Sequence, residues 1–116
     1  MKINERKIAL LTKKANLGDP VAQHKLAFCY QAGENIKQDY LKAMNLWKSS
    51  ASKGYGKAYY NLSSMYFNGL GVKPNYKKTY EYLLLSIKKK HTYQSHSYRI
   101  LAQKFYLQGL AGKKKY

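Results

Sequence analysis

A repeat of 36 residues constrains the fold of this chain more than any other feature of its sequence. Identical residues recur at this offset in the pairs Gly18/Gly54, Ala22/Ala58, Leu26/Leu62, Tyr30/Tyr66, Gly33/Gly69 and Tyr40/Tyr76. A fixed period of this length is typical of proteins built from stacked units, each packed mainly on its neighbours. The repeat predicts one domain over the 116 residues, with a partial unit at 1–18, repeats at about 19–54 and 55–90, and a diverged terminal unit at 91–116.

Within each unit the spacing of apolar residues is helical. Ala22, Leu26 and Tyr30 lie four residues apart, on one face of an amphipathic helix. Asp19, followed by a proline, is a helix start signal, and Gly33 permits the left-handed backbone that ends a helix. These signals predict six helices, at about 4–16, 20–32, 40–53, 56–68, 76–90 and 95–108, and no strand. Helix pairs repeated in this way stack into an all-α, right-handed solenoid of antiparallel pairs.

The residues at the repeating positions resemble those of a known family. They are Gly18-Asp19, Ala22, Leu26-Ala27, Tyr30, Gly33, Asp39, Lys42-Ala43, Trp47, Ala51 and Gly54, followed in the next unit by the loop Gly69-Leu70-Gly71-Val72. This pattern is similar to the Sel1-like repeats, which are relatives of the tetratricopeptide repeats. The resemblance implies a non-enzymatic protein-binding adaptor or inhibitor, and some small members of the family are immunity proteins that neutralise a cognate antibacterial toxin. The matched residues themselves are expected to pack the helices together.

Groups that could support catalysis or metal binding are sparse. The chain has five acidic residues, scattered along its length, and two of them are explained as helix caps. His24, His91 and His96 do not follow a metal-ligand spacing, and Cys29 is expected to be a small packed side chain. The sequence therefore predicts a protein that is not an enzyme and has no cofactor or metal.

No segment of the sequence indicates a membrane span or a targeting peptide. The apolar run near the N-terminus is too short for a signal peptide, and no stretch approaches the roughly 20 apolar residues of a membrane helix. The single cysteine cannot form an internal disulfide, which fits a reducing compartment. We expect a cytoplasmic protein, or a periplasmic one if a leader has been removed.

A candidate binding groove follows from the helical angles. Positions opposite the buried face of each first helix are expected to line the concave surface of the solenoid. They are His24, Phe28, Gln31, Lys57, Tyr60, Phe67, Ile100, Lys104 and Leu107. Aromatic and aliphatic side chains at positions where an isolated helix would be polar are typical of a protein-binding groove. The alternative is that neighbouring helices cover some of them.

The charge of the chain suggests the chemistry of its partner. Twenty-two Lys and Arg against five Asp and Glu give a formal net charge of +17, while 45% hydrophobic residues argue against a disordered polycation. A basic patch is expected from Lys73, Lys77, Lys78, Lys88, Lys89, Lys90, Lys113, Lys114 and Lys115. A field of this sign steers acidic partners, so we expect an acidic protein. The alternative is a nucleic acid bound by lysine–phosphate contacts and tyrosine stacking, against which stands the presence of only two arginines.

Overall fold

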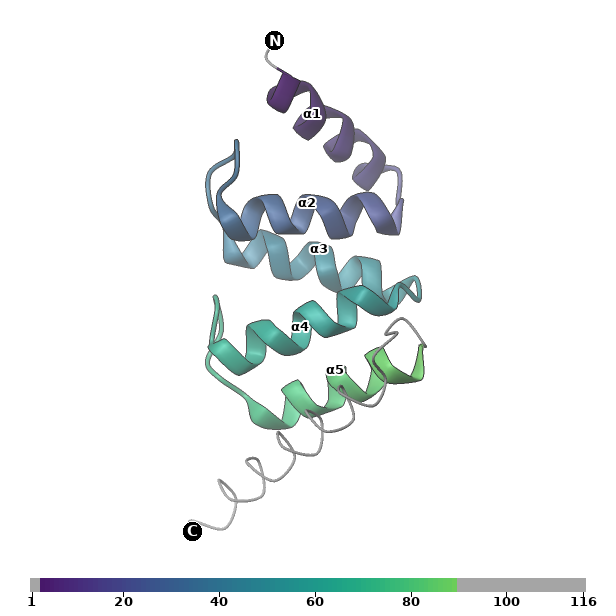
Figure 1. Cartoon of the computed structure of the whole chain (residues 1–116), viewed down its shortest axis with the longest axis vertical. Coiled ribbons are helices and arrows are strands. Elements are labelled where there is room, and N and C mark those ends of the chain that lie inside the picture. Colours follow the sequence, from purple (N-terminus) through teal and green to yellow (C-terminus); the bar gives the residue numbers. More distant parts are fainter. Residues whose placement is uncertain (1–2, 90–116) are drawn as a thin grey trace.

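The computed structural model describes residues 3–89, which form five helices joined by short loops (Figure 1). They are α1 (Ile3–Asn16), α2 (Pro20–Ala32), α3 (Tyr40–Ser52), α4 (Gly56–Asn68) and α5 (Tyr76–Lys88). Consecutive helices run antiparallel, with α2 and α3 forming one pair and α4 and α5 the next (Figure 1). The predicted all-α architecture of stacked helix pairs is confirmed, and the five helices lie within two residues of their predicted bounds. The sixth predicted helix, 95–108, lies outside the described residues.

The helix ends are set by local side-chain chemistry that recurs in both units. The Asp39 carboxylate accepts a hydrogen bond of 3.0 Å from the Lys42 backbone N–H, and the Asn75 amide oxygen accepts the corresponding bond, also 3.0 Å, at the start of α5. The Asp19 carboxylate caps α2 in the same way. Such caps satisfy backbone donors that have no partner within the helix.

The loop between the two helices of each pair closes in the same way in both units. Gly33 and Gly69 end α2 and α4 with φ angles of +70° and +67°. Only glycine adopts this left-handed conformation without steric cost. The carbonyl oxygens of Tyr30 and Tyr66, three residues before these glycines, each accept a backbone hydrogen bond of 2.9 Å. The donors are the backbone N–H groups of Asp39 and Asn75, which cap the following helices.

The core lies between the two helix pairs and is centred on Trp47, whose side chain is fully buried. Small residues allow the helices to approach one another closely, and larger ones fill the space between them. The core consists of Ala27, Ala43, Met44, Trp47, Ala51, Ala58, Leu62, Met65 and Tyr66. A smaller cluster of Ala15, Ala22 and Leu26 packs α1 onto α2.

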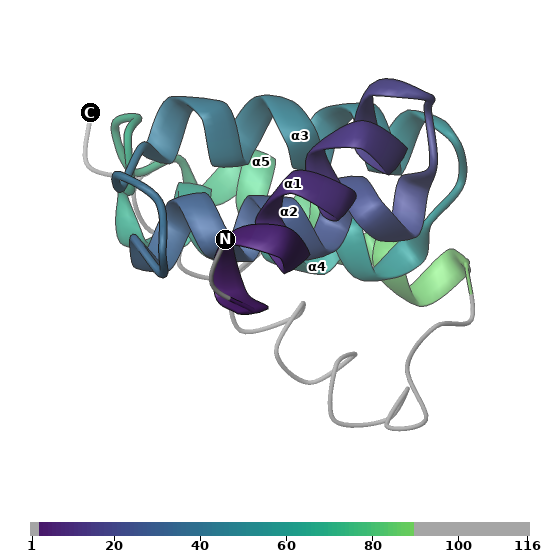
Figure 2. The ribbon, with the colours of Figure 1, turned by 90° about the horizontal axis from the view of Figure 1, so that it is seen from above.

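The stacking of the pairs gives the molecule two distinct sides. Viewed along the stack, α2 and α4 lie along one side and α3 lies along the other (Figure 2). The outer surfaces of α2 and α4 therefore lie on the same side of the molecule (Figure 2). We call this side the α2/α4 face.

Candidate functional site

Four ring side chains meet where α2, α3 and the start of α4 come together. The ring of Phe28 lies edge-to-face against Trp47 at a centroid distance of 5.1 Å and against His24 at 4.9 Å. His24 in turn lies edge-to-face against Tyr55 at 5.1 Å. These arrangements are the ones that aromatic quadrupoles favour. We refer to His24, Phe28, Trp47 and Tyr55 as the aromatic cluster.

His24 lies beneath this surface and does not line it as the sequence predicted. Only 8% of the residue is exposed, and its Nδ1 accepts a hydrogen bond of 3.1 Å from the Trp47 indole N–H. The pKa of His24 is lowered from 6.5 to about 4, chiefly by burial and in addition by the positive charges of Lys57 and Lys25. The imidazole is therefore neutral at pH 7, and its role is to orient the indole and support Phe28.

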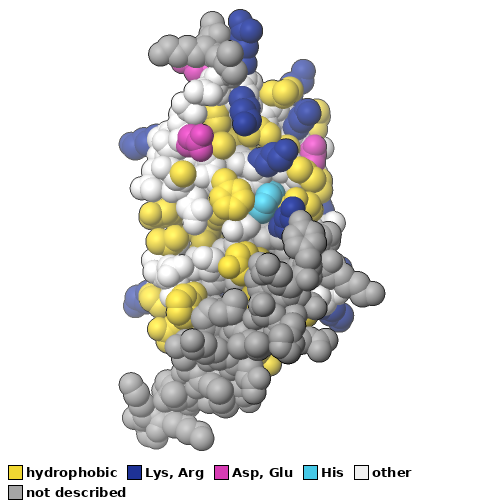
Figure 3. Space-filling model, in the orientation of Figure 1, with side chains coloured by type: hydrophobic (Ala, Val, Ile, Leu, Met, Phe, Trp, Pro, Cys, Tyr) yellow, Lys and Arg dark blue, Asp and Glu magenta, His cyan; other side chains and the backbone are white. Residues whose placement is uncertain are grey.

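Phe28 is the member of the aromatic cluster that reaches solvent. Its side chain is 42% exposed although two other rings hold it in place. Lys25 and Lys57 are exposed nearby, close enough to His24 to perturb its pKa. Figure 3 shows the same combination on this side of the molecule, with apolar side chains in yellow beside a histidine in cyan and basic side chains in blue.

The other predicted groove residues differ in how much they reach the surface. Tyr60, on α4, is 36% exposed, whereas Phe67 is half-buried and its ring lies 5.6 Å from the ring of Tyr76. Gln31 is half-buried near the end of α2. Ile100, Lys104 and Leu107 lie outside the described residues. The described part of the predicted groove therefore has two exposed rings, Phe28 and Tyr60.

The predicted basic patch is divided between the two ends of α5. Lys73, Lys77 and Lys78 are exposed around the start of this helix, and Lys88 and Lys89 are exposed at its end. A rise of 1.5 Å per residue separates the two groups by roughly 16 Å. The described lysines therefore form two basic surfaces, and Lys90 and Lys113, Lys114 and Lys115 lie outside the described residues.

Sequence reasoning identified Trp47 as a core residue but missed the contact of Tyr55 with His24. Tyr55 immediately precedes α4, outside any helical period, so no pattern in the sequence relates it to α2. Within residues 3–89, no three His, Cys, Asp or Glu side chains are placed to hold a metal ion, and no helix is long and apolar enough to span a bilayer.

Comparison with known proteins relates the chain to one repeat family. The Sel1 repeat family model matches residues 20–55 and 56–91, which together make up more than half of the chain. A crystal structure of a Sel1 repeat protein from Oxalobacter formigenes is similar over 76% of this chain and 36% of its own, with 30% identity and a TM-score of 0.71.

A more distant similarity shows the fold alone. The crystal structure of c5321, a protective antigen present in uropathogenic Escherichia coli strains that displays an SLR fold, matches 90% of this chain and 26% of its own at 22% identity and a TM-score of 0.67. This chain thus spans about a third and about a quarter of these two proteins. None of the curated proteins matches it.

Proposed function

Because the chain belongs to the Sel1 repeat family, whose repeats are protein-interaction modules, we propose that it is a non-enzymatic adaptor or inhibitor that binds an acidic protein through the α2/α4 face. Phe28 is the anchor of this contact in the proposal, and Tyr60 and Lys57 extend it onto α4. The proposal includes the case in which this chain is an immunity protein and its partner is the toxin that it neutralises.

The observation that carries the proposal is the exposure of Phe28 on a rigid support. A large aromatic side chain that is held by neighbouring rings loses little conformational freedom when a partner covers it. Phe28 is 42% exposed yet contacts both Trp47 and His24, and Trp47 is fully buried. This combination is typical of the residues that dominate the free energy of protein association.

The charge around Phe28 supports an acidic partner. Lys25 and Lys57 are exposed on the α2/α4 face, and the whole chain has a formal net charge of +17. Charges at the rim of an interface mainly increase the association rate and select against partners of the same sign. A partner with carboxylates around a small apolar patch fits this surface.

The same net charge favours nucleic acid as a second candidate partner. The basic side chains are almost all lysines, which contact phosphates as point charges, and tyrosines are available for stacking on bases. Binding of this kind releases several counterions and weakens steeply with salt. It would depend little on a single apolar side chain such as Phe28.

The experiment that tests the proposal begins with capture of partners by the tagged chain from a native lysate. The washes use about 0.15 M and then about 0.5 M salt, at which surface charges are strongly screened, with and without nuclease. The affinity of a captured protein is then measured by calorimetry for the unaltered chain, Phe28→Ala and Leu84→Ala. Leu84 is a matched control, because it is also 42% exposed but lies on α5.

We expect one protein to survive both washes and the nuclease, and Phe28→Ala to weaken its binding by about 1–3 kcal/mol while Leu84→Ala has little effect. Circular dichroism of the free variants checks that Phe28→Ala has kept its helices. Recovery of nucleic acid alone, lost on nuclease treatment, would replace the proposal with the second candidate. Equal affinities for the two alanine variants would reject Phe28 as the anchor.

A further inference from the structure

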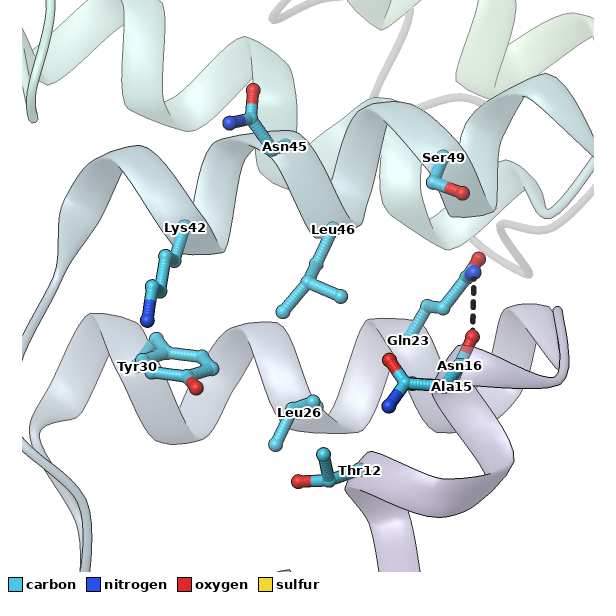
Figure 4. Close-up of a pocket in the computed structure, with 10 residues that line it drawn as sticks. All are labelled: Thr12, Ala15, Asn16, Gln23, Leu26, Tyr30, Lys42, Asn45, Leu46 and Ser49. Carbon is cyan, nitrogen blue, oxygen red and sulfur yellow. Dashed lines mark hydrogen bonds between the residues drawn. The ribbon is translucent and has the colours of Figure 1, made fainter.

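A cleft opens on the side of α2 that faces away from Phe28. It lies between α1, α2 and α3, has a volume of about 470 Å³, and is lined by Thr12, Leu26, Tyr30, Leu46 and others (Figure 4). Leu26 and Tyr30 are two residues before and after Phe28, so the helical angle of 100° per residue places them on the opposite side of α2. The cleft and the α2/α4 face are therefore separate surfaces.

The internal repeat shows what occupies the corresponding place one unit further along the chain. The counterparts of Gln23, Tyr30 and Leu46, 36 residues later, are Tyr59, Tyr66 and Tyr82. The ring of Tyr82 stacks on Tyr66 at a centroid distance of 5.7 Å and on Tyr59 at 6.2 Å.

In the first unit, two of these three tyrosines are replaced by other residues. Leu46 stands in place of Tyr82, and Gln23 stands in place of Tyr59. Tyr30, the counterpart of Tyr66, is retained and forms part of the wall. The first unit therefore keeps one ring of the three and has a leucine and a glutamine, both in the cleft lining, where the second unit has the other two tyrosines.

The walls of the cleft are held in place by hydrogen bonds. Gln23 is 5% exposed, its amide N–H donates to the Ala15 carbonyl oxygen at 3.1 Å, and its amide oxygen accepts from the Lys53 ammonium at 3.1 Å. Figure 4 shows the first of these bonds at one end of the cleft and Lys42 reaching towards Tyr30 at the other. A pocket that is already formed costs little conformational entropy to fill.

Positive charge borders the cleft at both ends. The Lys42 ammonium lies 5.4 Å from the centroid of the Tyr30 ring, and the Lys53 ammonium is bonded to Gln23. An aromatic group that enters between them brings any attached acidic group close to a lysine. The cleft thus combines apolar walls with charges that select a negatively charged ligand.

We propose that this cleft binds one aromatic side chain of a protein partner, flanked by acidic residues, in the place that Tyr82 fills in the second unit. The inference rests on the proposed function in taking the ligand to be a protein, but it uses a different surface. The ring stacks on Tyr30 and contacts Leu26 and Leu46. Neighbouring carboxylates pair with Lys42 and Lys53.

The test is a methyl NMR titration of the full chain with two peptides. The probe is acetyl-Glu-Tyr-Glu-amide, and the control is acetyl-Glu-Ala-Glu-amide, which carries the same charge without the ring. We expect the tyrosine peptide to shift the methyl resonances of Thr12, Leu26 and Leu46 with a dissociation constant on the order of millimolar, as is reasonable for so small a ligand. The alanine peptide is expected to bind at least tenfold more weakly.

Two variants taken from the second unit should close the cleft. Leu46→Tyr and Ser49→Leu install the residues found at positions 82 and 85, and each should weaken binding of the tyrosine peptide at least tenfold. Leu41→Tyr is the matched control, because it adds the same ring to α3 at a position that is already exposed and outside the cleft lining. It should leave the affinity unchanged.

Four results would overturn the inference: no shift of the cleft methyls in the unaltered chain, equal binding of both peptides, unchanged affinity in folded Leu46→Tyr and Ser49→Leu, or equal weakening by Leu41→Tyr. Shifts confined to residues around Phe28 would reject the cleft and leave the α2/α4 face as the binding surface. If the cleft methyls shift but a captured partner binds Phe28→Ala as tightly as the unaltered chain, the α2/α4 face is rejected and the cleft is retained.

Discussion

Acidification to about pH 5 should destabilise this protein through His24, and substitution of His24 by Asn should remove that effect. His24 is buried, and its Nδ1 accepts a hydrogen bond from the Trp47 indole N–H at 3.1 Å. The neutral ring therefore carries its proton on Nε2. Protonation at Nδ1 would place two N–H donors against each other and put a positive charge near Lys25 and Lys57. The folded state resists that protonation.

The magnitude follows from the difference between the two states. The pKa of His24 is about 4 in the folded protein against 6.5 for an ordinary histidine, chiefly because of burial. At about pH 5 the unfolded chain binds a proton at this position and the folded chain does not, so stability falls as the pH falls from 7.5. The loss is about 2 kcal/mol, because pH 5 lies roughly 1.5 units below the ordinary pKa of histidine and each unit is worth about 1.36 kcal/mol. Salt screening of the exposed lysines reduces this, so we expect roughly 1–2 kcal/mol at physiological ionic strength.

The assay is urea unfolding followed by tryptophan fluorescence at about pH 7.5 and pH 5.0. Trp47 is the only tryptophan in the chain and is fully buried, so its emission reports unfolding of the core. The carboxylates are the same in the unaltered chain and in His24→Asn, so their contribution cancels in the comparison. His24→Asn keeps an acceptor oxygen on a short side chain but does not titrate, and other histidines contribute equally to both proteins.

The informative quantity is the change in the free energy of unfolding between the two pH values, compared between the two proteins. His24→Asn is less stable at both values because it loses ring contacts, but it should lose about 1–2 kcal/mol less than the unaltered chain on acidification. Equal losses in the two proteins would refute the reasoning. They would mean that His24 is protonated as easily in the folded state as in the unfolded one.

Two further predictions concern the free energy of unfolding, measured by the same assay, and the first compares equivalent positions of the two units. Ser50→Ala should cost about 1–2 kcal/mol, because the buried Ser50 hydroxyl donates to the Pro20 carbonyl oxygen at 2.7 Å. Ser86→Ala, at the equivalent position of the second unit, should be neutral or stabilising, because the buried Ser86 hydroxyl has no hydrogen-bond partner within residues 3–89. Similar costs at both positions would contradict this. Gly69→Ala should cost more than Gly54→Ala. Both glycines have positive φ angles, so an alanine at either position costs about 1–2 kcal/mol in backbone strain. A Cβ at Gly69 would also lie 2.8 Å from the Pro74 ring, whereas one at Gly54 meets only the Lys89 ammonium at 4.0 Å. A larger loss for Gly54→Ala would show that the contact with Pro74 relaxes without cost.

The helices were predictable from sequence because their ends depend on neighbours along the chain. Asp39 caps α3 through the N–H of a residue three positions later, and Gly33 ends α2 through its own backbone angle. The repeat adds a second copy of each signal, at Asn75 and Gly69, so each boundary is indicated twice. Interactions of this range are visible in a single sequence.

The environment of His24 was not predictable in the same way. Projection of α2 onto a helical wheel directs His24 away from Leu26 and towards solvent. The structure instead covers it with Trp47, 23 residues later in the sequence, and with Tyr55 from the next unit. Phe28 lies one turn further along α2 and stays exposed at the edge of the same contacts. A single helix contains no information on which of two outward positions its neighbours will cover.

The cleft was also beyond sequence reasoning, because it arises from side chains that are smaller than their counterparts. Leu46 and Gln23 are ordinary residues for a helix that packs on another, and nothing in the pattern marks them as unusual. Their significance depends on the stacking of Tyr82 with Tyr59 and Tyr66, which only the structure shows. Empty space next to α1 is a property of three helices together.

Both candidate binding surfaces include positions at which the two units differ. Several positions that are identical in both units form helix ends and core, among them Gly33/Gly69 and Ala22/Ala58. Tyr30, Lys42 and Lys53, which border the cleft, are also identical to their counterparts. The differing pairs at the two candidate surfaces are Phe28/Ser64, Trp47/Leu83, Gln23/Tyr59 and Leu46/Tyr82. In each pair the first residue belongs to the α2/α3 unit, where it supplies an exposed ring, supports one or leaves a space for one. The α2/α3 unit therefore departs from its neighbour on both sides of α2, while the residues shared by the two units maintain the common architecture.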